Sequence, residues 1–94
     1  MLNKEQKKHL LARAHSLKPV VLIGKNGFTN QVTNEIEVAL TAHQLIKIRA
    51  NKASTDEVKD FTQKILDKTQ AFLVQRTGGT MVFYRPDEEN PLIK

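Results

Sequence analysis

A strand, a glycine-framed turn and a helix follow one another directly in the first third of the chain. Residues 20–23 read VVLI, a short apolar run that predicts a strand buried on both faces or nearly so. Residues 24–27 read GKNG and predict a tight turn. A helical pattern then begins at Thr29, whose hydroxyl can cap the first N–H groups. Only folds in which a strand leads through a turn into a covering helix accommodate this unit.

The remainder of the chain continues the alternation. Residues 45–50 place Ile46 and Ile48 on one face of a strand and Lys47 and Arg49 on the other. Ser54 and Glu57 match a capping box, and the pair Gly78-Gly79 predicts a tight hairpin turn. The expected elements are helices over residues 3–16, 29–43 and 54–69, and strands over residues 20–23, 45–50, 71–77 and 80–85.

This order, α-β-α-β-α-β-β, predicts an α/β fold with a small four-stranded mixed sheet. Because crossover connections are right-handed, the first three strands should be parallel, and the hairpin makes the fourth antiparallel. The second and third helices should cover one face. The length of 94 residues indicates one domain, which we assign to residues 1–86. Residues 87–94 are expected to form a loose, acidic and polar tail.

Composition bounds the environment of the chain. No cysteine is present, which excludes disulfides and cysteine-ligated zinc. The longest apolar runs are far too short to cross a membrane, and the first residues lack the apolar core of a signal peptide. We therefore expect a soluble, intracellular protein, which we assign to the cytoplasm. We also expect it to be a monomer.

The positive charge lies at the beginning of the chain. The net charge is +5, and residues 1–25 hold six basic side chains against one acid, Glu5. A lysine-rich helix is often only a solvated face, and that interpretation stays open. Its position beside an anion-ready turn favours a polyanionic partner instead. The basic residues are Lys4, Lys7, Lys8, Arg13, Lys18 and Lys25.

The turn at residues 24–27 predicts an anion site. Backbone N–H groups, the positive end of the following helix and the Lys25 ammonium are all available to one phosphate. A dinucleotide site needs a third glycine and an acid after the second strand, and a P-loop needs Gly-Lys-Ser/Thr at the helix start. The sequence provides neither set. Two interpretations remain: a nucleic-acid phosphate site, or a tight turn with no ligand.

No catalytic site, metal site or cofactor is predicted. His9, His15 and His43 lack metal-ligand spacing. Ser54 is accounted for as a helix cap, and the acids that follow it are favoured by the helix dipole. Because no nucleophile, base and orienting group come together, the chain is not expected to be an enzyme. Phe28 either packs at the helix start or stacks on a base, and the paired aromatics of an RNA-recognition motif are missing.

Three blocks of sequence point to a known family. Residues 17–29 read LKPVVLIGKNGFT, residues 43–49 read HQLIKIR, and residues 84–86 read YRP. In order and spacing these blocks resemble the CRM domain, the family of the bacterial YhbY-like RNA-binding proteins. Phe28 stands where that family commonly has leucine. Gln44 stands where it commonly has glutamate, and the loss of a negative charge favours RNA.

The resemblance implies a fold similar to the C-terminal domain of translation initiation factor three. It also implies RNA binding through the glycine loop, and association with precursors of the large ribosomal subunit. We expect a protein that contacts the RNA backbone during large-subunit assembly, with precursor ribosomal RNA and pre-ribosomal particles as partners. The alternative is a protein-interaction module that docks on a ribosomal protein or assembly factor through the acidic third helix. The expected RNA contacts are Lys18, Gly24, Lys25, Asn26, Gly27, Lys47 and Arg49.

Overall fold

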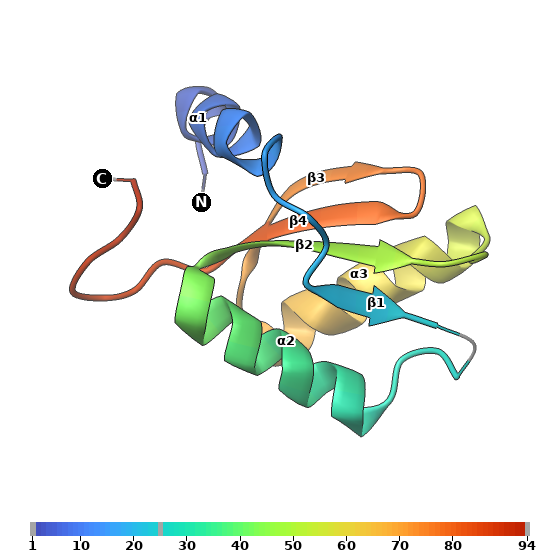
Figure 1. Cartoon of the computed structure of the whole chain (residues 1–94). Helices are drawn as coiled ribbons and strands as arrows, with labels where there is room; N and C mark the ends of the chain where they lie inside the picture. The colour runs from blue at the N-terminus through green and yellow to red at the C-terminus, as the bar shows by residue number, and fades with distance from the viewer. Residues whose placement is uncertain (1, 25, 94) are drawn as a thin grey trace.

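The structure is a computed structural model of the chain that describes residues 2–24 and 26–93. Over these residues it has the predicted order of three helices and four strands (Figure 1). None of these helices is both long and apolar enough for a bilayer crossing. The elements are α1 (Lys4–Ala14), β1 (Val21–Ile23), α2 (Asn30–His43), β2 (Leu45–Ala50), α3 (Thr55–Thr69), β3 (Phe72–Thr77) and β4 (Thr80–Tyr84).

The four strands form one mixed sheet in the order β1-β2-β4-β3. β1 pairs with β2 in parallel, and β4 is antiparallel to both of its neighbours. The first three strands therefore run in one direction and the last runs against them, as predicted. The loop after β1, the loop after β2 and the β3–β4 turn consequently meet at one end of the sheet, on the right in Figure 1.

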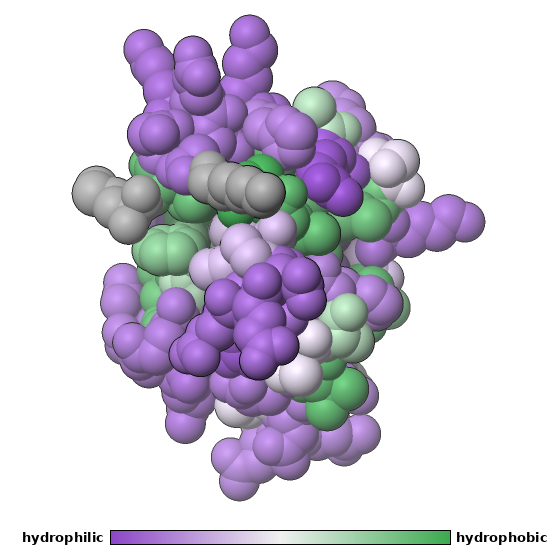
Figure 2. All heavy atoms as spheres, turned by 90° about the vertical axis from the view of Figure 1, so that its left-hand side faces the viewer, coloured by the Kyte–Doolittle hydropathy of each residue, from purple (hydrophilic) through white to green (hydrophobic). Residues whose placement is uncertain are grey.

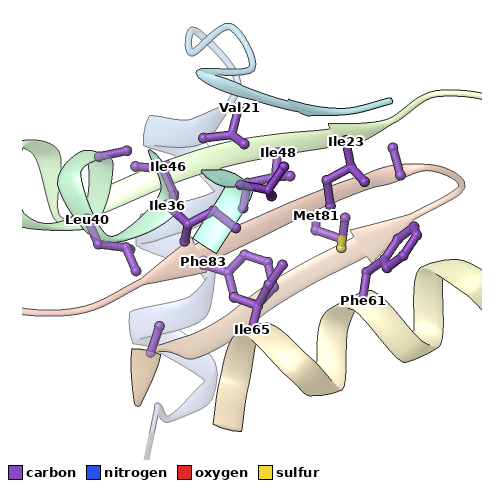
Figure 3. Packing of buried hydrophobic residues seen from close by; sticks show 14 of the residues in the cluster. Val21, Ile23, Ile36, Leu40, Ile46, Ile48, Phe61, Ile65, Met81 and Phe83 are labelled. Atoms are coloured by element: carbon purple, nitrogen blue, oxygen red, sulfur yellow. The ribbon is translucent and has the colours of Figure 1, made fainter. Parts of the chain in front are cut away.

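The main core lies between the sheet and the pair α2 and α3, which cover the same face as predicted. Figure 3 shows Ile36 of α2 and Ile65 of α3 pointing toward Ile48, Met81 and Phe83 of the sheet. All five side chains are buried. Helix α1 lies on the opposite face, where Leu10 and Ala14 pack in a second cluster. The strand members of that second cluster are Leu45, Val74, Val82 and Tyr84.

Side-chain caps define where the helices begin. The Thr29 hydroxyl accepts from the Val32 N–H at 3.2 Å, so Thr29 caps α2 as predicted. Ser54 and Glu57 form the predicted capping box of α3, with bonds of 3.1 and 3.0 Å. Each such cap contributes about 1 kcal/mol to stability. The starts of α2 and α3 are thus fixed locally, at the same end of the sheet.

β1 is an edge strand with one open face, and the prediction that it is buried on both faces is wrong. Val21 and Ile23 are buried in the main core, but Val20 and Leu22 are 52% and 57% exposed. Leu22 lies on the α1 side of the sheet, opposite Arg49 in the strand register, whereas Val20 lines a hollow together with residues of α2. α1 packs over β2 and β3 and leaves β1 uncovered (Figure 1). Apolar composition alone therefore overstated the burial of this strand.

Three residues of the predicted tail, Asn90, Leu92 and Ile93, contact the rest of the chain. The Gln44 side chain donates to the Asn90 carbonyl at 2.8 Å and accepts from the Leu92 N–H at 3.0 Å. Leu92 and Ile93 pack against the cluster beneath α1. Figure 2 views this end of the molecule and shows hydrophobic surface below the hydrophilic side chains at the top. Gln44 therefore has a structural role, which the sequence comparison of glutamine with glutamate at this position did not predict.

Arg85, directly after β4, contacts α2 and α3 on the face of the sheet opposite α1. Its guanidinium forms an ion pair with Glu37 of α2 at 2.9 Å and donates to the Thr69 carbonyl of α3 at 3.1 Å. A further bond reaches the Thr41 hydroxyl at 3.1 Å. One side chain thus connects both helices of the main core.

Candidate functional site

The predicted anion site lies in the loop between β1 and α2. The Gly27 N–H donates to the Gly24 carbonyl at 3.0 Å and closes the turn. Gly27 has a φ of +71°, which an L side chain adopts only with strain. Asn26 is exposed at the tip, and Lys25, the predicted cation of this site, lies outside the described residues. Gly27 is therefore required by the backbone of the turn itself.

Gly24 is different, because nothing in the structure requires a glycine there. Its φ lies outside the left-handed region, and a Cβ built on it would meet no atom within 4 Å. Close approach of a ligand or of another backbone is one use of glycine that requires neither a positive φ nor a crowded Cβ. The open space faces solvent, since Gly24 is exposed. The geometry thus leaves room for another molecule directly after β1.

The start of α2 is open to an anion, whereas the start of α3 is not. The first turn of α2 contains no acidic residue, although its helix dipole places partial positive charge there. The first turn of α3 holds Asp56 and Glu57, which satisfy the dipole of that helix internally. The glycine loop therefore leads to the helix end with unbalanced positive character.

Phe28 anchors this loop to the core. Its ring stacks on the ring of Phe61 of α3, with centroids 6.4 Å apart and an interplanar angle of 22°. Phe28 is partly buried and packs against the main core, which is the first of the two roles predicted for it. A groove of about 600 Å³ lies alongside and is lined by Gly24, Gly27, Lys52 and Phe61, among others.

The predicted basic strand faces the α1 side of the sheet, as the alternation indicated. Lys47 is partly buried, and Arg49 is exposed on the same face, opposite Leu22 of β1 in the strand register. Lys18 is exposed in the connection from α1. The connection then joins β2 through the Val20 N–H, which donates to the Lys47 carbonyl at 2.9 Å. Lys47 and Arg49 thus share one face of the sheet, and Lys18 lies in the connection from α1 that leads to β1.

Charge is divided between the two sides of the sheet. α1 carries four basic residues and one acid, and β2 adds Lys47 and Arg49. α2 and α3 together carry six acids and three lysines. Several of these acids have partners within the protein: Asp60 pairs with Lys64 at 2.9 Å, and Glu57 completes a capping box. The side with α1 is thus the one suited to a polyanion.

The sequence over residues 2–85 matches the model of the CRS1 / YhbY (CRM) domain. The chain belongs to the CRM domain family. A Haemophilus influenzae protein named "RNA-binding protein" is 42% identical over 88 residues, which are 94% of this chain and 89% of the relative. The Bacillus subtilis protein named "Probable RNA-binding protein YqeI" is 32% identical over 94 residues, which are all of this chain and 98% of the relative.

The fold of this CRM domain is also similar to a solved structure. SAV1595 from Staphylococcus aureus, described as a candidate RNA-binding protein, superposes with a TM-score of 0.83 at 32% identity. The match covers all of this chain and 98% of that one. The α/β architecture described above is thus shared with that protein.

Sequence reasoning missed several polar residues beside the basic strand. A hollow of about 180 Å³ lies where the end of α1 meets the sheet, next to Lys47. The alternating pattern predicted that Gln75, Thr77 and Thr80 belong to strands, but it did not predict that they lie beside Lys47. The side chains lining the hollow are Leu11, Ala14, His15, Lys47, Gln75, Thr77, Thr80 and Val82.

Proposed function

We propose that this CRM-domain protein binds RNA and grips a phosphate of the backbone at the glycine loop. Gly24 carries the proposal, because its glycine has no explanation within the fold and stands where another backbone could come close. The names of its relatives support RNA as the ligand. The wholly internal alternative, a turn with no ligand, accounts for Gly27 but not for Gly24.

The chemistry is charge neutralisation and hydrogen bonding to phosphate oxygens. N–H groups of the loop and the dipole of α2 face the phosphate, and Lys25 supplies a full positive charge. Asn26 adds an exposed amide at the tip. Lys18, Lys47 and Arg49 continue the positive track over the α1 side of the sheet. Binding of this kind depends strongly on salt and weakly on sequence.

The biological setting that we propose is assembly of the large ribosomal subunit in the cytoplasm. The resemblance to stand-alone YhbY-like proteins supports it, with precursor ribosomal RNA and pre-ribosomal particles as partners. The protein acts as a monomer, without a cofactor and without catalysis. The rival role, protein docking through α3, is weakened by the contacts that Glu57 and Asp60 make within that helix.

Lys25→Glu tests the proposal. We expect RNA affinity to fall about tenfold or more, and the slope of log K against log salt to become shallower by roughly one phosphate contact. Lys59→Glu is the matched control, because it makes the same charge change on the exposed side of α3. Affinity is measured by titration of a labelled RNA dodecamer.

The two variants separate a local contact from a general effect of net charge. If both variants lower the RNA affinity equally, the effect comes from net charge alone and the glycine loop is not the phosphate site. Wild-type affinity in a normally folded Lys25→Glu protein would exclude the phosphate grip. Crosslinking to RNA in cells, followed by sequencing of the attached fragments, tests the ribosomal setting separately.

A further inference from the structure

Four side chains form a row across the open half of the sheet, on the α1 side. The strand register places Leu22 of β1 opposite Arg49 of β2, Arg49 opposite Thr80 of β4, and Thr80 opposite Thr77 of β3. Neighbouring strands lie about 4.8 Å apart, so the row spans about 14 Å. We call these four residues, Leu22, Arg49, Thr80 and Thr77, the transverse row.

The transverse row is accessible because α1 covers the other half of this face. Leu22 is 57% exposed, and Arg49 and Thr77 are also exposed. In Figure 1, α1 lies over the left part of the sheet and leaves the end near the glycine loop uncovered. Leu22 precedes Gly24 by two residues, so the row begins where the glycine loop begins. At its other side, Thr77 and Thr80 also line the hollow beside α1.

The chemistry of the row suits the faces of bases as well as phosphates. None of the four strands contains an aspartate or glutamate, so no acidic side chain of the strands repels a polyanion. Arg49 offers a planar guanidinium on which a base can stack, and Leu22 offers an apolar surface beside it. The threonine hydroxyls can donate to or accept from base edges and ribose hydroxyls. Phe72 and Tyr84, the aromatic strand residues on this face, pack beneath α1 instead.

We propose that the transverse row binds unpaired nucleotides, so that this protein prefers single-stranded RNA to duplex RNA. The inference rests on the proposed function: the glycine loop holds a phosphate of either form, and the row then takes the adjoining bases. A duplex buries the faces of its bases in its own stack and cannot present them to Arg49 and Leu22. The RNA strand would then continue from Thr77 and Thr80 into the hollow beside α1.

The test compares one RNA dodecamer as a single strand and as a duplex with its complement. Arg49→Lys keeps the charge and removes the plane, and Leu22→Ser removes the apolar surface from an exposed position. We expect each to weaken single-strand binding about fivefold and duplex binding less than twofold. Matched controls are Arg76→Lys and Val38→Ser, since Arg76 pairs with Met81 of the core face and Val38 is 70% exposed on α2.

The outcomes distinguish this inference from the proposed function. Equal effects of Arg49→Lys and Leu22→Ser on both RNA forms, or no effect on either, overturn the row as a single-strand site and leave RNA binding standing. A wild-type preference for the duplex overturns it as well. Lys25→Glu should weaken both forms alike; if it weakens neither while the row variants act as expected, the phosphate grip fails and the row stands.

Discussion

Replacing Gly24 with alanine separates the folding of the glycine loop from its proposed binding role. The added methyl group meets no atom within 4 Å, and the backbone there does not have a positive φ. The substitution should therefore cost no folding free energy, and the restricted unfolded chain should add about 0.4–1 kcal/mol of stability. The same substitution at Gly27 forces alanine to a φ of +71° and should cost about 1–2 kcal/mol.

The two variants should therefore differ clearly in unfolding. For a domain of this size each 1 kcal/mol corresponds to about 4–8 °C in melting temperature. Gly24→Ala should melt at or slightly above the wild-type temperature, and Gly27→Ala several degrees below it. In the proposed complex, the methyl group on residue 24 occupies the space into which the RNA backbone would approach. We expect Gly24→Ala to lose about tenfold in RNA affinity, equivalent to about 1.4 kcal/mol.

The assay is thermal and urea unfolding of both variants, together with titration of a labelled RNA dodecamer into each. Gly24→Ala should thus be the more stable variant and nonetheless a weak binder. A Gly24→Ala protein that unfolds more easily than Gly27→Ala contradicts the geometry of the turn. Wild-type affinity in a stable Gly24→Ala protein refutes close approach of the RNA backbone at this residue.

Two further substitutions test contacts that hold the fold around the site. Gln44→Leu removes both the donor to the Asn90 carbonyl and the acceptor of the Leu92 N–H, and should cost about 1 kcal/mol of stability, with faster amide exchange at Leu92; unchanged exchange there would show that residues 90–93 are held by other contacts. Arg85→Lys loses the forked contacts to Glu37 and the Thr69 carbonyl and should cost about 1–2 kcal/mol in urea unfolding. An unchanged urea midpoint and slope would remove Arg85 as a tie between the helices.

Features governed by neighbours in sequence could be predicted. The capping box of Ser54 and Glu57 and the cap at Thr29 involve residues three apart, so the sequence pattern specifies the contact. The face of β2 that carries Lys47 and Arg49 followed from strand alternation in the same way. The hydrogen bond between Gln44 and Asn90 joins residues 46 positions apart, and no local pattern in either segment predicts it. Long-range contacts of this kind depend on where the elements pack.

The same distinction between local and long-range contacts applies to the candidate site. The glycine loop was visible because turn, cap and lysine are adjacent in the chain. Thr77 and Thr80 were assigned correctly to strands, but their place beside Arg49 depends on β4 lying between β2 and β3. Strand order is a property of the whole sheet, so no window of sequence contains it. Residues that reach a site through strand order are the ones that sequence reasoning misses.

The error over β1 and the proposed single-strand site have one physical origin. An apolar run such as residues 20–23 predicts burial on both faces when a helix covers each side of the strand. Here α1 packs over β2 and β3 and stops short of β1, so Leu22 remains in solvent beside Arg49. A half-exposed leucine next to a guanidinium lowers the stability that this strand could have had. Such a local departure from good packing is expected where a surface is kept open for a ligand, which is the place that the transverse row occupies.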